Sequence, residues 1–154
     1  MGTDTDLPTA ARDLVQHTRR IADIGLDDVP SVGGKGANLG ELTRCGLPVP
    51  GGFVVTAGSF TAAMAAAGCR DELADSSAAA PGMSEEELTR FAARARDLVR
   101  AADVPAEIAD AILAAGADVG ADRLAVRSSA TAEDSADTSF AGMHASFTNV
   151  TEEQ

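Results

Sequence analysis

One lysine in this chain stands inside a glycine-rich stretch, a placement typical of phosphate binding. The chain has 12 basic residues, of which Lys35 is the single lysine, and its surroundings read Gly33-Gly34-Lys35-Gly36. An ammonium is a compact charge that reaches a phosphate oxygen, and glycines let the backbone approach a bulky anion. A helix that begins just after the glycines would point unpaired N–H groups at the same anion. A solvated lysine on a structural glycine turn is an equally good interpretation of this stretch alone.

Two familiar phosphate loops do not match the stretch. A Walker loop needs a glycine at position 29 and Ser or Thr after the lysine, where this chain has Val29 and Gly36. The Gly-x-Gly-x-x-Gly spacing of dinucleotide-binding proteins is absent as well. A phosphate loop here would belong to neither of these classes.

A second polar segment begins with an arginine at the end of an apolar run. Arg127 follows Leu124-Ala125-Val126, and the chain continues Ser128-Ser129-Ala130-Thr131-Ala132-Glu133-Asp134. A guanidinium held at a strand end binds phosphate oxygens through two parallel hydrogen bonds, and loop hydroxyls and amides add neutral ones. The other interpretation is an ordinary cap in a polar loop, and these residues taken alone favour it.

Hydrophobic periodicity predicts the elements that would position both segments. We expect strands over 20–24, 53–55, 123–127 and 144–150. We expect helices over 37–44, 57–67, 85–102 and 105–116, the first closed by Gly46 and two opened by Thr56 and Ser84. Residues 27–30 are predicted to form a turn and 75–82 a loop. This order indicates a mixed α/β fold with helices clustered between two strand regions.

Composition excludes several classes of function. The formal net charge of −12 repels nucleic acid and anionic membranes. No apolar run approaches the ~20 residues of a membrane helix, and the acidic start of the chain lacks the pattern of a signal peptide. Cys45 and Cys69 have neither metal nor disulfide spacing, so we interpret them as small buried residues. These features predict a soluble cytoplasmic protein without nucleic-acid or membrane partners.

Taken together and in this order, the two segments resemble a known nucleotide-binding domain. Residues 27–56 are similar to the opening of the ATP-binding domain in the phosphoenolpyruvate synthase and pyruvate phosphate dikinase family, which includes rifamycin phosphotransferase. Residues 124–150 resemble the central signature of that domain, including Ser139-Phe140-Ala141-Gly142. The amino-acid sequence of residues 130–134 is closer to the synthase and rifamycin branches than to the dikinase.

The resemblance implies an ATP-grasp type fold, in which two α/β lobes hold ATP between them. It implies that Lys35 and Arg127 bind the ATP phosphates and that Gly142 contacts the nucleotide through its backbone. Ser146 stands where the family commonly has an ATP-binding threonine. Met143 departs from the pattern, because those branches usually have glutamine there. No catalytic residue and no metal ligand is expected within the chain.

The resemblance also implies what surrounds this segment. Residues 1–19 are expected to be a loosely held leader, and residues 20–154 the N-terminal portion of the ATP-binding domain, with the second lobe absent. That lobe would supply the acidic Mg2+ ligands, and a phosphohistidine domain would follow, in cis or as a separate chain. The whole enzyme would pass a phosphoryl group from ATP to a histidine carrier and then to pyruvate, whereas the chain alone would transfer nothing. The alternatives are a rifamycin-type antibiotic phosphotransferase fragment, or a non-catalytic interaction or regulatory module that kept the fold.

Overall fold

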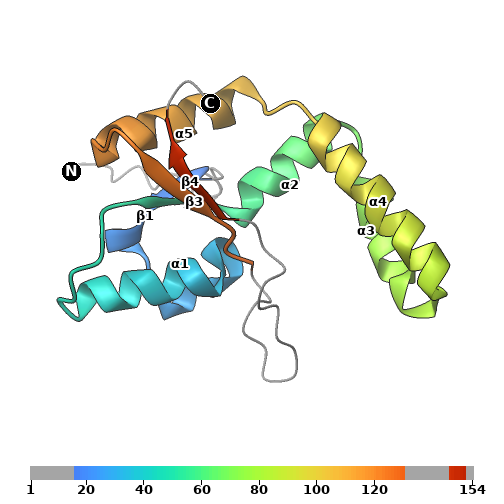
Figure 1. Ribbon diagram of the computed structural model, residues 1–154, viewed down its shortest axis with the longest axis horizontal. Coiled ribbons are helices and arrows are strands. Elements are labelled where there is room, and N and C mark those ends of the chain that lie inside the picture. The colour runs from blue at the N-terminus through green and yellow to red at the C-terminus, as the bar shows by residue number, and fades with distance from the viewer. Residues whose placement is uncertain (1–15, 131–145, 152–154) are drawn as a thin grey trace, which may run out of the picture.

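A computed structural model describes residues 16–130 and 146–151 of the chain (Figure 1). Over these residues, strand β1 (Thr18–Arg20) pairs antiparallel with β2 (Phe53–Val55), and β3 (Leu124–Arg127) pairs antiparallel with β4 (Ser146–Val150). The α-helices in the same residues are α1 (Val29–Arg44), α2 (Ala57–Ala66), α3 (Arg70–Ala79), α4 (Glu85–Ala101) and α5 (Ala106–Val119). The mixed α/β class predicted from the sequence is confirmed.

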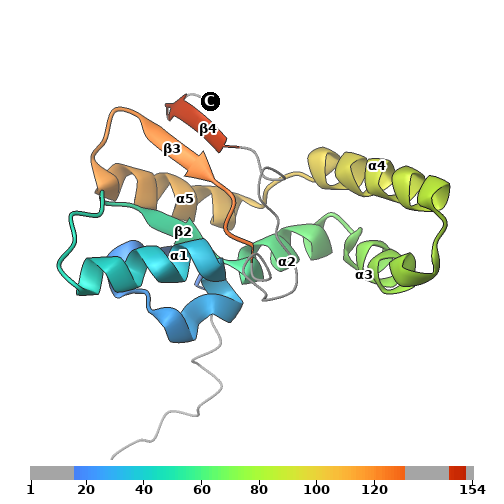
Figure 2. The same ribbon diagram turned by 60° about the horizontal axis from the view of Figure 1, so that its bottom comes forward.

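The elements form a layered body and a two-helix arm. In both Figure 1 and Figure 2 the β1–β2 pair lies between α1 and α5, while α3 and α4 run side by side away from the body. Leu73 of α3 and Leu98 of α4 pack against one buried cluster, and Arg94 Nε lies 2.5 Å from Glu72 Oε1 across the two helices. The arm is therefore held by apolar packing on one side and by an exposed ion pair on the other.

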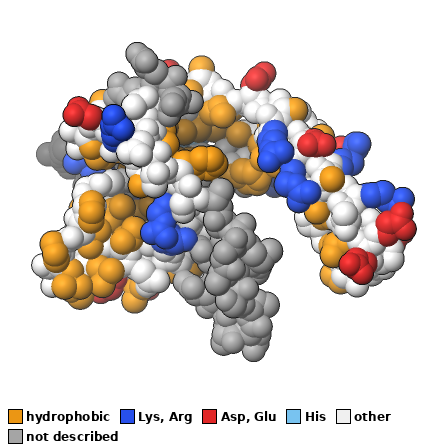
Figure 3. All heavy atoms as spheres, viewed as in Figure 1, with side chains coloured by type: hydrophobic (Ala, Val, Ile, Leu, Met, Phe, Trp, Pro, Cys, Tyr) orange, Lys and Arg blue, Asp and Glu red, His pale blue; other side chains and the backbone are white. Residues whose placement is uncertain are grey.

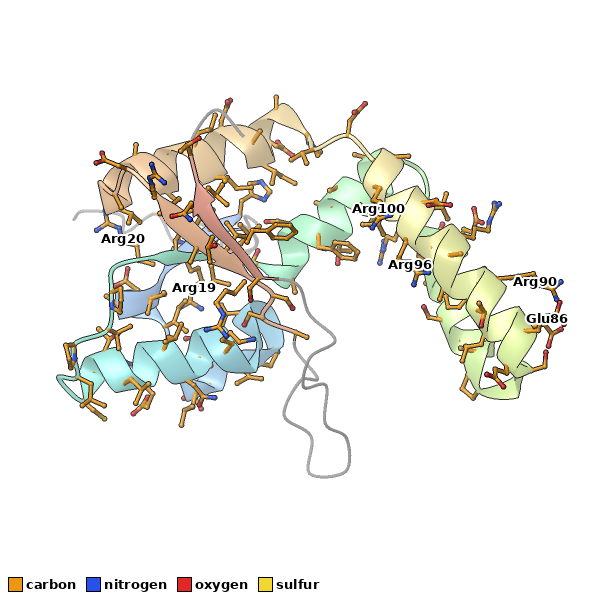
Figure 4. The ribbon with its side chains drawn as sticks, viewed as in Figure 1. Arg19, Arg20, Glu86, Arg90, Arg96 and Arg100 are labelled. Carbon is orange, nitrogen blue, oxygen red and sulfur yellow. The ribbon has the colours of Figure 1, made fainter. Side chains whose placement is uncertain are left out.

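The arginines of α4 lie on a solvated face. Arg90, Arg94, Arg96 and Arg100 are all exposed. Figure 4 shows Arg90 beside Glu86 at the outer end of the helix, where the nitrogen and oxygen are 3.5 Å apart. An exposed pair one helical turn apart contributes only about 0.3–0.5 kcal/mol, and this pair lies within α4, so it adds nothing to the contact between α3 and α4.

Local capping sets several helix boundaries where the sequence predicts them. The Thr56 hydroxyl accepts a hydrogen bond from the Ser59 N–H at 3.4 Å at the start of α2. Ser84 and Glu87 form the predicted capping box at the start of α4. Gly46 follows the end of α1 with φ of 76°, the left-handed conformation expected of a helix stop. These signals depend on residues close in the chain, and the predictions based on them are confirmed.

Other predicted boundaries are wrong. The first strand covers Thr18–Arg20 instead of 20–24, because residues 21–23 turn into a 3-10 helix after the Ile21 N–H bonds to the Gly52 carbonyl at 3.0 Å. Helix α1 begins at Val29 and not at 37, since Pro30 stands in its first turn, where a missing N–H costs nothing. Helix α5 continues past Gly116 and ends at Val119, ahead of Gly120 with φ of 65°.

The loop predicted over 75–82 is also wrong. Residues 70–79 form α3, and only Ala80–Gly82 is a 3-10 turn. Alanine has the highest helix propensity, and Leu73 gives the helix a side chain that reaches the core. Cys69, just ahead of α3, is buried as expected, but Cys45 is exposed because it lies at the end of α1.

The described residues bury two small apolar clusters. One joins α1 to β2 and contains Ile24, Val32 and Ala37. The other joins α2, α5 and the arm through Ala63, Met64, Cys69 and Ile108. Large hydrophobic side chains remain at the surface, among them Phe60 at 54% and Phe147 at 61% exposure, and Figure 3 shows hydrophobic side chains over much of the visible face. No helix within the described residues is long and apolar enough to cross a lipid bilayer.

An ion pair joins β1 to the turn that precedes α1. The Arg19 guanidinium donates to the Asp28 carboxylate at 2.5 and 3.3 Å, and the Gly25 N–H donates to it at 2.8 Å. The hydrogen bond from Arg19, and after it the one from the Gly25 backbone, lowers the pKa of Asp28. A carboxylate with a lowered pKa stabilises the fold above its unfolded pKa of ~3.9, and this contribution is lost as the pH falls through the lower, folded value.

We expect Asp28→Asn to reduce the free energy of unfolding by about 1 kcal/mol at pH 7, because the charged hydrogen bonds are lost. The difference from wild type should shrink below about pH 4, where the wild-type carboxylate begins to take up a proton. Urea unfolding at pH 7 and pH 3 measures both effects. Asp27→Asn, at an exposed neighbouring position, is the matched control. An equal loss at both pH values would contradict the assigned role of the carboxylate.

Candidate functional site

The glycine-rich segment lies inside α1 and bends it. Gly33 has φ of 74° and ψ of 165°, which divides α1 into a part before the bend and a part after it. The bend brings the Gly33 backbone against the segment that follows β3. A Cβ atom at Gly33 would lie 2.6 Å from Ser129 Oγ and closer still to the Ser129 carbonyl oxygen. Glycine is needed here both for its positive φ and for its lack of a side chain.

Hydrogen bonds hold the two segments together across 93 positions of the chain. The Gly36 N–H donates to Ser129 Oγ at 2.9 Å, and the Ser129 hydroxyl donates to the Val32 carbonyl at 2.7 Å. The Gly34 N–H donates to the Ala130 carbonyl at 3.3 Å. The two segments singled out by their composition are therefore in direct contact.

Lys35 reaches the end of β3. Its Nζ donates to the main-chain carbonyl of Ser128 at 2.8 Å, and the side chain is partly buried. Ser128 directly follows Arg127, so the ammonium lies next to the residue that carries the guanidinium. The backbones of the Lys35 and Arg127 segments therefore lie side by side.

Arg127 faces another predicted site residue across the strand pair. Arg127 and Ser146 are direct partners in the register of β3 and β4, and both are exposed. Directly opposite residues of an antiparallel pair project from the same face, with Cβ atoms about 4.5–5.5 Å apart. A cation and a hydroxyl thus share one face at the end of the pair near Lys35. Gly142, Met143 and His144 lie outside the described residues.

Two glycine amides at this site are already hydrogen-bonded within the protein. The Gly34 N–H donates to Ala130 and the Gly36 N–H to Ser129. Gly33 breaks α1, so the part of the helix after the bend begins at these glycines, and the two amides belong to its first turn. The glycines allow a second backbone to approach closely. Ser129 is among the loop hydroxyls predicted to add neutral hydrogen bonds, but its contact with the glycines joins positions 93 residues apart, which sequence pattern does not reveal.

The side chains at this junction are of types that bind anions. Lys35 and Arg127 supply two positive charges, and Ser146 adds a neutral hydrogen-bonding group. Over residues 16–130 and 146–151, no three His, Cys, Asp or Glu side chains are grouped so that they could hold a metal ion. Anion binding here would rely on side-chain charge, since two nearby amides are already hydrogen-bonded.

A cavity of about 590 Å³ lies elsewhere in the body. It is lined by β1, by residues 49–53 and by alanines of α5, and none of the predicted site residues borders it. Arg20 and Asp118 on its wall form an ion pair with nitrogen and oxygen 2.6 Å apart, and Figure 4 shows Arg20 near the end of α5. Asp23 adds a further carboxylate to the wall, so the cavity has no spare positive charge for an anion. The candidate site is the junction of α1 with β3 and β4.

Comparison with known families identifies the domain that contains both segments. The model of the pyruvate phosphate dikinase AMP/ATP-binding domain matches residues 29–154, which include both segments. The chain belongs to this family. The AMP/ATP-binding domain is the ATP-grasp-like N-terminal part of these proteins, so the resemblance and the fold class predicted from the sequence are both confirmed.

Relatives of this AMP/ATP-binding domain include two kinds of phosphotransferase. The chain is 38% identical over 143 residues to a probable phosphoenolpyruvate synthase of Methanothermobacter thermautotrophicus, covering 89% of the chain and 21% of that protein. It is 37% identical to the phosphoenolpyruvate synthase of Pseudomonas aeruginosa, covering 89% and 18%. It is 43% identical over 132 residues to the rifampicin phosphotransferase of a Streptomyces species, covering 84% and 15%. The chain thus spans about a fifth or less of these relatives.

Gly33→Ala should destabilise the domain far more than Gly46→Ala. Both glycines have φ near 75°, at 74° and 76°, so an alanine suffers similar backbone strain, about 1 kcal/mol, at either position. A Cβ at Gly46 meets nothing within 4 Å, whereas at Gly33 it meets the Ser129 backbone. We expect a loss of about 3 kcal/mol or more at Gly33, measured by urea unfolding. Equal losses for the two variants would contradict the close approach of the segments.

Proposed function

We propose that this member of the ATP-binding domain family binds the phosphates of ATP with Lys35 and Arg127. The observation that carries the proposal is the hydrogen bond from Lys35 Nζ to the carbonyl of Ser128, the residue next to Arg127. It joins the only lysine of the chain to the end of β3, next to the residue that carries the guanidinium. Two cations on separate, rigidly joined elements suit a ligand that carries several negative charges.

Each side chain has a distinct part in this proposal. Lys35 exchanges the neutral Ser128 carbonyl for a phosphate oxygen, and a charge-assisted hydrogen bond is the stronger of the two. Arg127 binds phosphate oxygens in two-point fashion, which a planar guanidinium favours. Ser146, on the same strand face, donates a neutral hydrogen bond in place of the family's threonine. Gly142 contacts the nucleotide through its backbone, as the family resemblance implies.

The proposed reaction belongs to a larger assembly than this segment. ATP phosphorylates a histidine carrier, and the carrier passes the phosphoryl group to pyruvate, as in a phosphoenolpyruvate synthase. Mg2+, held by acidic residues of a second lobe, neutralises the phosphate charge during transfer. The chain supplies the phosphate-binding Lys and Arg, and the lobe and the histidine come from other parts of the protein or from a separate chain. Residues 20–154 form the proposed N-terminal portion, preceded by a proposed leader over residues 1–19, of which Thr18 and Arg19 already belong to β1.

A second candidate is an antibiotic phosphotransferase. The identity of 43% to the rifampicin phosphotransferase exceeds the 38% to the archaeal phosphoenolpyruvate synthase, over similar lengths. The two candidates share the ATP site and differ only in the final acceptor. Incubating the protein at its natural length with Mg-ATP and either pyruvate or rifampicin, and following products by phosphorus NMR, distinguishes them.

Lys35→Ala and Arg127→Ala should each weaken the binding of Mg-ATP about 10- to 100-fold, because each removes charge-assisted hydrogen bonds of about 1.5–3 kcal/mol. Isothermal titration calorimetry of the protein at its natural length measures the affinity. Arg123→Ala is the matched control, since Arg123 is an exposed arginine just ahead of the same strand. Wild-type affinity in both site variants would refute the proposed phosphate contacts.

A further inference from the structure

We propose that Ser129 is a positioning residue for nucleotide binding. Its hydroxyl takes the place of a broken helical hydrogen bond in α1 and so fixes Lys35 beside Arg127. The inference rests on the proposed function, since Lys35 and Arg127 are there the groups that meet the phosphates. Ser129 itself need not touch the nucleotide.

Ser129 bonds to two backbone groups, the Gly36 N–H and the Val32 carbonyl, that would bond to each other in a regular α-helix. In a regular helix the N–H of residue 36 donates to the carbonyl of residue 32, four positions earlier. Gly33 lies between them in a non-helical conformation, which breaks this direct bond. The Gly36 N–H donates instead to Ser129 Oγ at 2.9 Å, and that hydroxyl donates onward to the Val32 carbonyl at 2.7 Å. A side chain inserted into the helical ladder is a recognised cause of a kink.

Burial makes this hydroxyl hard to replace. Val32 and Gly36 are both buried, with Val32 at 2% exposure. Water therefore has little access to the carbonyl and the N–H when the hydroxyl is removed, and an unsatisfied buried polar group is costly. The variant backbone is left with both groups unpaired, because Gly33 keeps them from bonding to each other directly. The loss weakens the attachment of the bend at Gly33 to the end of β3.

The consequence for Lys35 follows from its neighbours. Gly34 is bonded to Ala130 and Gly36 to Ser129, so the residues on either side of Lys35 are both attached to the segment after β3. The base of the lysine side chain is therefore fixed before any ligand arrives. A group that is already in place loses less conformational entropy on binding, and its contact with the ligand is stronger for that reason.

We expect Ser129→Ala to weaken Mg-ATP binding about ten-fold, measured by calorimetry on the protein at its natural length. Ser129→Thr keeps a hydroxyl and should stay within about three-fold of wild type. Ser31→Ala is the matched control, because it removes a hydroxyl bond of 3.0 Å in the same helix ahead of the bend. It should stay within about two-fold of wild type. Hydrogen exchange at the Gly36 amide should accelerate in Ser129→Ala and in no other variant of this series.

The outcomes separate the positioning role from the proposed function. Wild-type affinity in folded Ser129→Ala, with weakened binding in Lys35→Ala and Arg127→Ala, overturns the positioning role alone. Wild-type affinity in all three variants overturns the proposed function as well. A lower melting temperature with unchanged affinity indicates a purely structural role for Ser129. Where Ser129→Ala does not fold, Ser129→Cys retains the shape with a weak hydrogen-bonding group, and wild-type affinity in that variant also overturns the positioning role.

Discussion

The close approach of the Gly33 backbone to Ser129 is the contact on which the site depends. The described strands form two separate antiparallel pairs, β1–β2 and β3–β4, with no strand joining one pair to the other. Helix α1 packs on the first pair through Val54, and its bend at Gly33 meets the segment that leaves the second pair. Hydrogen bonds from Gly34 and Gly36 complete that junction. Two parts of the chain that share no sheet are thereby joined.

This junction uses glycine for a different purpose from a classical phosphate loop. In such loops the glycine amides stay available for the anion. Here the amides of Gly34 and Gly36 attach a second backbone. In the proposed site, the side chains of Lys35 and Arg127 would have to recognise the anion. Side-chain charge on an exposed strand end is screened by salt more than a buried array of amides is. Because the charge resides in side chains, a substitution at position 35 or 127 changes the charge of the site without altering the backbone.

The sequence predicted what depends on neighbouring residues and missed what depends on distant ones. Thr56, Ser84 and Gly46 mark helix ends through contacts with residues a few positions away, and those boundaries were found. The bend in α1 was missed because its cause, Ser129, lies 93 positions from Gly36. Residues 75–82 were predicted to form a loop because they combine serine and alanine with a proline and a glycine. The chain forms α3 instead, and Leu73 of this helix is partly buried against the apolar cluster. Tertiary contact overrides local preference in both cases.

The register of β3 and β4 explains why the face beside Lys35 is polar. The pairing shifts between Leu124 and Val126, and Asn149 on β4 has φ of 61°, a conformation that asparagine tolerates better than most residues. This bulge absorbs an extra residue at the far end of the pair and leaves Arg127 opposite Ser146. A slip of one residue would place Phe147 opposite Arg127 and turn the hydroxyl to the other face. An apolar ring would then stand beside the guanidinium, so the bulge protects the polar character of the site.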